Sequence, residues 1–277
     1  MRIALIADTF PPMQTSGAVQ LRDLSREFVR QGHAITVLLP SPDQEALWSL
    51  EEFDGVELLR LKAPRTKDIS YFRRTLGECI MPFAMLRQFR KSPLARETWD
   101  GIVWYSPSIF HGPLAKALKI SSNCRGYLII RDLFPEWAVD VGLIGRGLPY
   151  IFFKTVANYQ YAAADFIGVQ SQGNLGYFKD WQQLPGRKLE VLQNWLSKPA
   201  QARCTIRVNN TALAERKVFV YAGNMGVAQG MNILLDLAEN LKHRTDVGFL
   251  FVGRGRDNIS LKDLTKDRKL DNVLFYD

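Results

Sequence analysis

The ten residues from Tyr221 to Gly230, YAGNMGVAQG, are the stretch whose residue types could most directly bind a ligand. A short apolar run beginning at Lys217 precedes them, and apolar residues at helical spacing follow from Met231. The pattern predicts a strand, a glycine loop and a helix start. Glycines admit a ligand close to the backbone, and the amides of a helix N-terminus favour a phosphate. A turn that uses its glycines only for packing is the alternative.

Polar, turn-forming residues also follow several strands expected earlier in the chain. Ser106 and Pro107 follow one strand, Arg131 to Trp137 (RDLFPEW) follow the next, and Gln193 to Trp195 follow a third. In open α/β sheets, ligands bind outside the carboxyl ends of the strands. The sequence therefore predicts a second binding region on these loops.

The elements that position these residues alternate between strand and helix. A strand over residues 2–7, an amphipathic helix ending at Gly32 and a strand over residues 34–39 form an opening βαβ unit. The fold class is α/β with parallel sheets. A polar stretch over residues 197–216 is interpreted as a hinge between a domain of residues 1–196 and a second, incomplete domain of residues 217–277, with three expected strands.

Composition excludes several classes of protein. With 277 residues, 47% hydrophobic and 23% charged, the chain has the composition of a folded soluble protein. No apolar run approaches the roughly 20 residues that span a bilayer. Three widely spaced cysteines indicate neither a disulfide framework nor a zinc ribbon, which fits a reducing cytoplasm. Pro11 and Pro12 stand where a dinucleotide-binding G-x-G-x-x-G would follow the first strand, and no P-loop motif occurs.

The net charge of +8 is concentrated between Arg60 and Arg96, where ten basic residues face two acidic ones. The same segment carries a stripe of apolar side chains: Tyr71, Phe72, Leu76, Ile80, Phe83, Leu86 and Phe89. A helix that is both Arg-rich and aromatic is typical of an interfacial membrane helix. The alternative is an ordinary helix, bent at Pro82, that packs its apolar face on the sheet. Nucleic acid is disfavoured because no nucleic-acid-binding motif accompanies the charge.

Taken in order, these segments resemble the GT-B glycosyltransferases of family 4, and most of all the branch that makes bacterial surface polysaccharides. The resemblance covers nearly the whole chain. It rests on the following residues: Pro12, Gly17, Gly32-His33, Ser106-Pro107, Arg131 to Glu136, Asn194-Trp195, Tyr221 to Gly226 with Gln229-Gly230, and Phe251 to Gly253. It implies two facing Rossmann-like domains, of which the first holds the acceptor and the second the sugar nucleotide.

The resemblance implies a donor site around the glycine loop. The donor diphosphate would face the backbone amides of this loop, including those of Gly223 and Gly226, and the side chain of Asn224. These groups would stabilise the diphosphate as it departs. Asn224 and Gln229 occupy places where many members carry Arg and Lys, and Arg254 is a candidate replacement cation. Gly17 would bring the loop after the first strand to the same diphosphate.

Two further residues are candidates for catalysis. The resemblance places Asp132 where a carboxylate could orient the acceptor, and His111 near the position of an active-site histidine. Glu136 is better explained as an acid at a helix N-terminus. No metal and no cofactor other than the donor, a UDP-sugar, are expected.

The implied function is retaining transfer of a hexose or N-acetylhexosamine from a UDP-sugar to a lipid-linked or saccharide acceptor. The protein would work in the cytoplasm, peripherally at the inner face of the plasma membrane. Family members place an E-x7-E pair beyond the position of Asp277, so we expect this chain to be incomplete and poorly active. The alternatives are a truncated, non-catalytic membrane-associated protein and, less favoured, a sugar-nucleotide epimerase.

Overall fold

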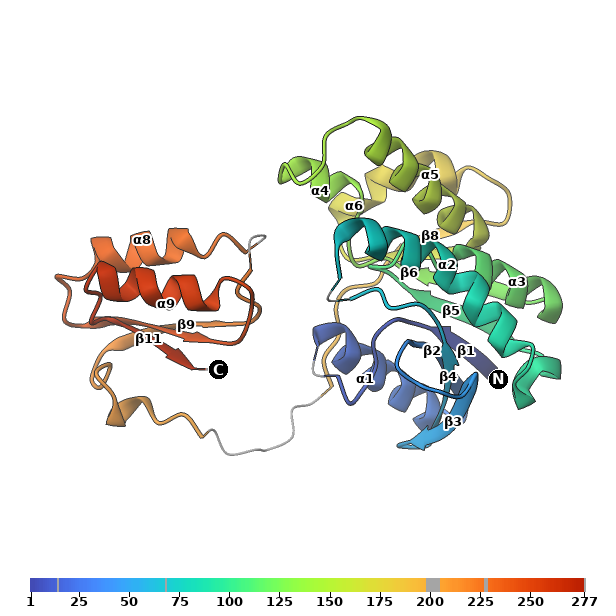
Figure 1. Cartoon of the computed structure of the whole chain (residues 1–277), viewed down its shortest axis with the longest axis horizontal. Helices are drawn as coiled ribbons and strands as arrows, with labels where there is room; N and C mark the ends of the chain where they lie inside the picture. The colour runs from blue at the N-terminus through green and yellow to red at the C-terminus, as the bar shows by residue number, and fades with distance from the viewer. Residues whose placement is uncertain (14, 68, 198–204, 227–228, 277) are drawn as a thin grey trace. The chain divides into compact units, whose positions relative to one another are not determined.

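A computed structural model describes residues 1–277 except 14, 68, 198–204, 227–228 and 277. The chain forms two compact units, Met1–Lys198 and Pro199–Asp277 (Figure 1). Each unit has a sheet of its own, with helices packed on it. No helix among the described residues combines the length and the apolar character that crossing a bilayer requires.

The first unit is built on an eight-stranded sheet with the order β3-β4-β2-β1-β5-β6-β7-β8. Its strands are β1 (Arg2–Ile6), β2 (Ala34–Ser41), β3 (Trp48–Phe53), β4 (Val56–Lys62), β5 (Gly101–Tyr105), β6 (Arg125–Ile129), β7 (Phe166–Val169) and β8 (Lys188–Val191). All neighbours pair in parallel except β3, an edge strand antiparallel to β4. Because β2 and β5 flank β1 on opposite sides, the direction of strand progression reverses at β1.

Helices cover both faces of this sheet. One face packs against α1 (Ser16–Arg30), which contributes Leu21 to the core. The other packs against α2 (Tyr71–Phe89), α3 (Gly112–Ser122) and α5 (Leu148–Ala163). The shorter helical segments are η1 (Pro93–Arg96), α4 (Glu136–Asp140), α6 (Gln172–Leu175), η2 (Gly176–Phe178) and α7 (Lys179–Gln182).

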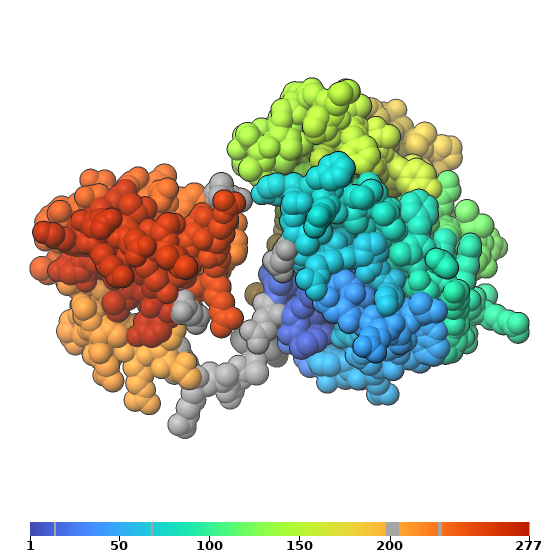
Figure 2. Space-filling model, in the orientation of Figure 1, coloured from blue at the N-terminus to red at the C-terminus, as the bar shows by residue number. Residues whose placement is uncertain are grey.

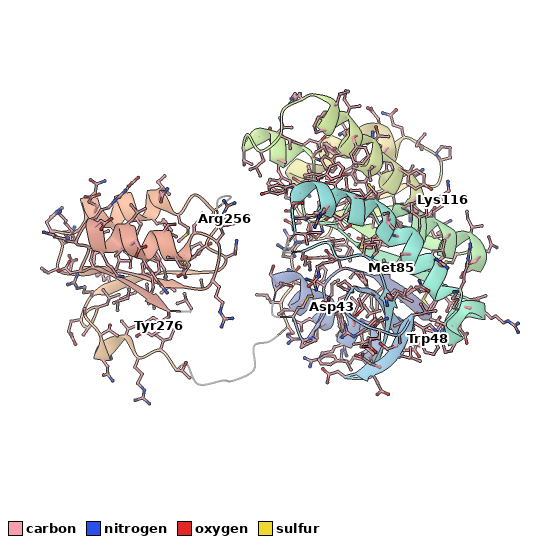
Figure 3. The ribbon with its side chains drawn as sticks, viewed as in Figure 1. Asp43, Trp48, Met85, Lys116, Arg256 and Tyr276 are labelled. Carbon is pink, nitrogen blue, oxygen red and sulfur yellow. The ribbon has the colours of Figure 1, made fainter. Side chains whose placement is uncertain are left out.

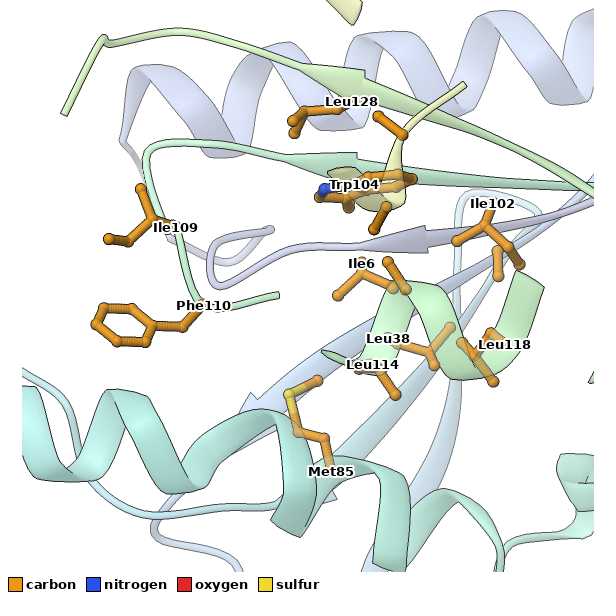
Figure 4. Close-up of a cluster of buried hydrophobic side chains, with 14 of the residues drawn as sticks. Ile6, Leu38, Met85, Ile102, Trp104, Ile109, Phe110, Leu114, Leu118 and Leu128 are labelled. Carbon is orange, nitrogen blue, oxygen red and sulfur yellow. The ribbon is translucent and has the colours of Figure 1, made fainter. Parts of the chain in front are cut away.

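The larger core of this unit lies between the sheet and the three-helix layer. Figure 4 shows Ile6 and Trp104 of the sheet beside Leu114 of α3, with Met85 reaching in from α2. These four side chains are at most 1% exposed. Burial of such side chains removes apolar surface from water and fixes the strand ends that carry the polar loops.

The second unit has a three-stranded parallel sheet with the order β11-β10-β9. Its elements are η3 (Val208–Asn210), β9 (Lys217–Ala222), α8 (Asn232–Asn240), β10 (Val247–Val252), α9 (Asn258–Asp267) and β11 (Val273–Tyr276). Residues 205–216 of the expected hinge belong to this second unit. Leu213 is fully buried there, and a Cβ on Gly248 would lie 2.7 Å from Cδ2 of Leu213. Residues 198–204 of the expected hinge lie outside the described residues.

Candidate active site

The glycine loop follows β9 in the second unit and is joined to the loop after β10. The amide of Gly223 donates to the Val252 carbonyl at 2.9 Å, and the amide of Met225 donates to the Arg254 carbonyl at 2.8 Å. Met225 is fully buried, whereas Asn224 beside it is exposed. The buried side chain of Met225 therefore anchors the loop in the core of the second unit, while the side chain of Asn224 is exposed to solvent.

Two glycines of the second loop allow this close approach. A Cβ on Gly253 would lie 2.0 Å from the carbonyl oxygen of Gly223, and one on Gly255 would lie 2.1 Å from that of Met225. Gly253 also has a φ of 143°, in the region that favours glycine. The two loops can lie against each other only because both positions lack a side chain.

Two of the residues predicted to bind the donor, Asn224 and Gly226, point their N–H groups at one oxygen of a third, Gln229. The Asn224 side chain donates from Nδ2 to Oε1 of Gln229 at 3.1 Å, and the amide of Gly226 donates to the same oxygen at 3.2 Å. Backbone and side-chain N–H groups that point at one oxygen form the kind of site that binds phosphate. The Gln229 carbonyl oxygen thus occupies a position that a ligand oxygen could take.

A cation is available on the neighbouring loop. Arg254 is exposed, and no ion pair holds it among the residues that the structure describes. It lines a hollow of about 330 Å³ together with Gly255, Asn258 and Ile259 at the start of α9. Asn258 is buried and donates to the Gly253 carbonyl at 3.0 Å, which fixes the loop on which Arg254 stands. Figure 3 shows Arg256, from the same loop, on the surface of this unit.

In the first unit, Gly17 lies where α1 meets the end of β5. A Cβ on Gly17 would lie 3.1 Å from Cγ2 of Thr9 and 3.2 Å from the hydroxyl of Tyr105. Thr15 caps the helix, its hydroxyl accepting from the Ala18 amide at 3.2 Å. A side chain at position 17 would therefore be tightly packed against Thr9 and Tyr105, so a packing role for this glycine stands beside the predicted contact with a ligand.

His111 is completely buried just before α3, and neither ring nitrogen has a hydrogen-bond partner among the described residues. Burial lowers the pKa of His111 below its ordinary value of 6.5, although the charge of Asp8, which lies close enough to act on the ring, opposes this shift. The imidazole is therefore neutral at neutral pH.

Asp132 and Asp8 surround the end of β5 from its two neighbouring strands. Burial, with smaller contributions from the charges of Asp132 and Asp8, raises the pKa of Tyr105 to about 12, while Arg131 opposes the shift. Asp132 is exposed, and Arg131 has a buried Nη1 without a partner among the described atoms. The carboxyl ends of β1, β5 and β6 thus bring together two carboxylates, a phenol and a guanidinium.

A cleft of about 370 Å³ lies at the carboxyl end of β1. It is lined by Asp8, Phe10, Pro12, Met13, Leu39, Pro40, Ser41 and Arg60. Neither Asp8 nor Tyr105 was predicted from the sequence as a functional residue. Asp8 follows β1, and Tyr105 is the last residue of β5. Because β1 and β5 are neighbouring parallel strands, their order in the sheet could have indicated that these two residues lie close together.

Glu136 has a structural environment. It begins α4, pairs with Lys154 and accepts from the Tyr150 hydroxyl at 3.3 Å. Burial alone would raise its pKa, but the hydrogen bonds from Lys154 and Tyr177 hold the pKa of Glu136 below its ordinary value. Within the described part of the chain, no group of three His, Cys, Asp or Glu side chains is arranged to hold a metal ion.

Comparison with known proteins identifies the type of fold. No protein-family model matches the chain. It is 22% identical, over an alignment of 308 residues, to the colanic acid biosynthesis glycosyl transferase WcaI of Escherichia coli K12, and the alignment covers all of this chain and 71% of that protein.

Two solved structures match nearly the whole chain at low sequence identity. One is the UDP-forming α,α-trehalose-phosphate synthase of Burkholderia xenovorans, with a TM-score of 0.68, 14% identity, and coverage of 99% of this chain and 74% of that one. The other is sucrose-phosphate synthase of Thermosynechococcus elongatus, with a TM-score of 0.66, 15% identity, and coverage of 99% and 69%. The chain therefore has the α/β fold of GT-B glycosyltransferases, as the sequence predicted, and is related in sequence to a glycosyl transferase.

Proposed function

We propose that the protein is a retaining glycosyltransferase that moves a hexose or N-acetylhexosamine from a UDP-sugar to a lipid-linked or oligosaccharide acceptor in polysaccharide biosynthesis. The carrying observation is the convergence of the Asn224 and Gly226 donors on one oxygen at the end of β9, in a chain with the GT-B fold. The trehalose-phosphate synthase that shares this fold is UDP-forming, which supports a UDP leaving group.

In this proposal the second unit holds the diphosphate of the donor. Gly223, Asn224 and Gly226 present N–H groups to the phosphate oxygens, and the Gln229 carbonyl moves aside as they arrive. Arg254, which has no ion pair among the described residues, adds a positive charge. Donors and charge that are in place before the reaction stabilise the departing diphosphate without reorganisation.

The first unit contributes the acceptor side. Asp132, exposed at the end of β6, orients the acceptor hydroxyl. Neutral His111, whose ring nitrogens have no hydrogen-bond partner among the described residues, is the candidate to hydrogen-bond a bound sugar. Gly17 holds the start of α1 near the end of β5. The departing diphosphate accepts the acceptor proton on the face where the new bond forms, which retains the anomeric configuration.

The experiment is a transfer assay with several UDP-sugars and sugar-diphosphate-polyprenol acceptors. NMR then gives the anomeric configuration of the product. A product with the configuration of its donor supports the proposal. An inverted product overturns the retaining mechanism, and a product made only from donors other than UDP-sugars overturns the donor assignment.

A further inference from the structure

The outer face of α2 carries large apolar side chains that are exposed, with no covering element among the described residues of the first unit. Phe72, Leu76, Ile80 and Phe83 recur at intervals of four, four and three residues, which places them along one side of the helix. All four are exposed, Phe72 to 81%. The opposite side, with Met81, Met85 and Phe89, already packs in the core. The interpretation of this stripe as a core-facing side is therefore wrong for its exposed members.

Helix α5 has a similar uncovered side in the same layer. Leu148, Ile151, Phe152 and Tyr159 are exposed, Leu148 to 82%, and their spacing again places them on one face. Leu143, on the connection from α4, is exposed as well. Since α2 and α5 pack on the same face of the sheet, with α3 contacting both, their outer sides face the same way. We call the exposed apolar side chains of α2, α5 and the α4–α5 connection the apolar platform.

Unpaired cations accompany the apolar platform. Arg87 and Arg90 extend the α2 stripe by further helical steps, and both are exposed without an ion pair among the described residues, as is Arg146 on the α4–α5 connection. Lys116 of α3, labelled in Figure 3, is exposed, and its ammonium lies 5.4 Å from the centroid of the Tyr159 ring. Asp140 at the end of α4 is an exposed acid in this region.

We propose that the apolar platform and its cations bind the interface of an anionic lipid bilayer. Aromatic and aliphatic side chains surrounded by Arg and Lys fit the boundary between acyl chains and negatively charged headgroups. A second copy of the chain fits less well, because a two-fold contact would bring the same cations together. Figure 2 shows that α2 and the α4–α5 segment reach the surface on the same face of this unit.

The test is sedimentation of the full chain with vesicles of phosphatidylglycerol and phosphatidylcholine, compared with pure phosphatidylcholine. We expect binding to the anionic vesicles that weakens with salt. Changing Leu148 and Ile151 together to Gln should abolish most of it. The matched control changes Ile233 and Leu237 to Gln, an exposed apolar pair on α8, and should bind as the unchanged protein does.

The charge contribution is tested separately. Arg87→Gln and Arg90→Gln should each weaken binding by about fivefold, whereas Lys242→Gln on the second unit should not. Absence of binding to anionic vesicles at low salt overturns the proposal, as does unchanged binding by the Leu148 and Ile151 variant. A dimer that the same variant dissociates, in a protein that ignores vesicles, would assign the platform to a second copy. None of these outcomes depends on glycosyl transfer, since UDP binding can be measured on every variant without lipid.

Discussion

The Gln229 side-chain oxygen lies 3.2 Å from the amide nitrogen of Gly226 and accepts its hydrogen bond. The Asn224 side chain donates to that oxygen too, so two donors of the glycine loop are satisfied from within the loop. A phosphate oxygen must replace the Gln229 oxygen to use them. In the proposed function, donor binding is therefore an exchange of hydrogen bonds within this loop.

This exchange predicts opposite effects for two neighbouring residues. Asn224→Ala removes a donor and should weaken UDP binding by about tenfold or more, because one hydrogen bond to a charged group is worth about 1.5–3 kcal/mol. Gln229→Ala removes only the competing oxygen and should bind UDP at least as tightly as the unchanged protein. Calorimetry on both variants measures this. Equal losses in the two variants would mean that Gln229 holds the loop open for the donor.

The glycine at position 253 should be essential for the second unit alone. Gly253→Ala places a Cβ 2.0 Å from the Gly223 carbonyl oxygen and should destabilise that unit by about 3 kcal/mol or more. All six tryptophans lie in the first unit, so their fluorescence reports only its unfolding, while circular dichroism reports both units.

We therefore expect an early transition in the circular dichroism of Gly253→Ala and an unchanged tryptophan transition. Gly145→Ala is the control, because a Cβ there meets nothing within 4 Å, and it should change neither signal. A Gly253→Ala protein that melts like the control would show that the two loops can separate at little cost.

Buried His111 predicts acid sensitivity of the first unit. Its folded pKa lies below its ordinary value of 6.5, so the unfolded chain binds more protons in the interval between the two. Stability is complete above about pH 6.5 and falls with decreasing pH, by up to about 1.4 kcal/mol per unit, until the folded pKa is reached. Urea unfolding followed by tryptophan fluorescence at about pH 7 and about pH 5.5 measures the loss.

The quantity to compare between variants is the difference in the free energy of unfolding between the two pH values, because the substitutions also change the stability at either pH. His111→Gln should lose much of the decrease between the two pH values. His33→Gln, on the turn between α1 and β2, should keep it. If both variants keep the full decrease, another group is responsible for it.

If Asp132 orients the acceptor, its substitution should reduce the rate of transfer without changing the affinity for UDP. Asp132→Asn keeps the shape of the side chain but removes its charge, and it should reduce transfer by about 100-fold or more if the carboxylate orients the acceptor. UDP affinity should stay unchanged. Asp140→Asn, another exposed acid of the same unit, is the control. An equal fall in UDP affinity and transfer would move Asp132 to the donor side.

Much of the fold follows from the sequence. The alternation of apolar runs and amphipathic segments predicts the parallel sheets and most helices of both units. Strand β3 was missed because Glu51 and Glu52 interrupt its apolar pattern and its side chains are half-buried or exposed. It forms an antiparallel edge strand, and one face of such a strand can be exposed to water and carry polar residues.

The details of the candidate site and of the apolar platform were harder to predict from the sequence than the fold. The apolar residues of α2 fall on two opposite sides of the helix, and a list of positions does not tell which side meets the sheet. The pairing of Gln229 with Gly226 depends on how one side chain folds back in a loop, for which the sequence has no periodic signal. Asp8 could have been found, because parallel order places the ends of β1 and β5 together.

The most direct test of the account is UDP binding by calorimetry to the 277-residue chain and to Gly226→Trp, with Gly145→Trp as a control on open surface. A side chain at position 226 would enter the space between Asn224 and Gln229, where a Cβ alone would lie 3.0 Å from Nδ2 of Asn224 and 3.2 Å from Oε1 of Gln229. We expect the unchanged chain to bind UDP, Gly226→Trp to abolish this binding and Gly145→Trp to preserve it. Binding that survives in Gly226→Trp, or a folded chain that binds no UDP, would contradict the assignment of the donor site to this loop.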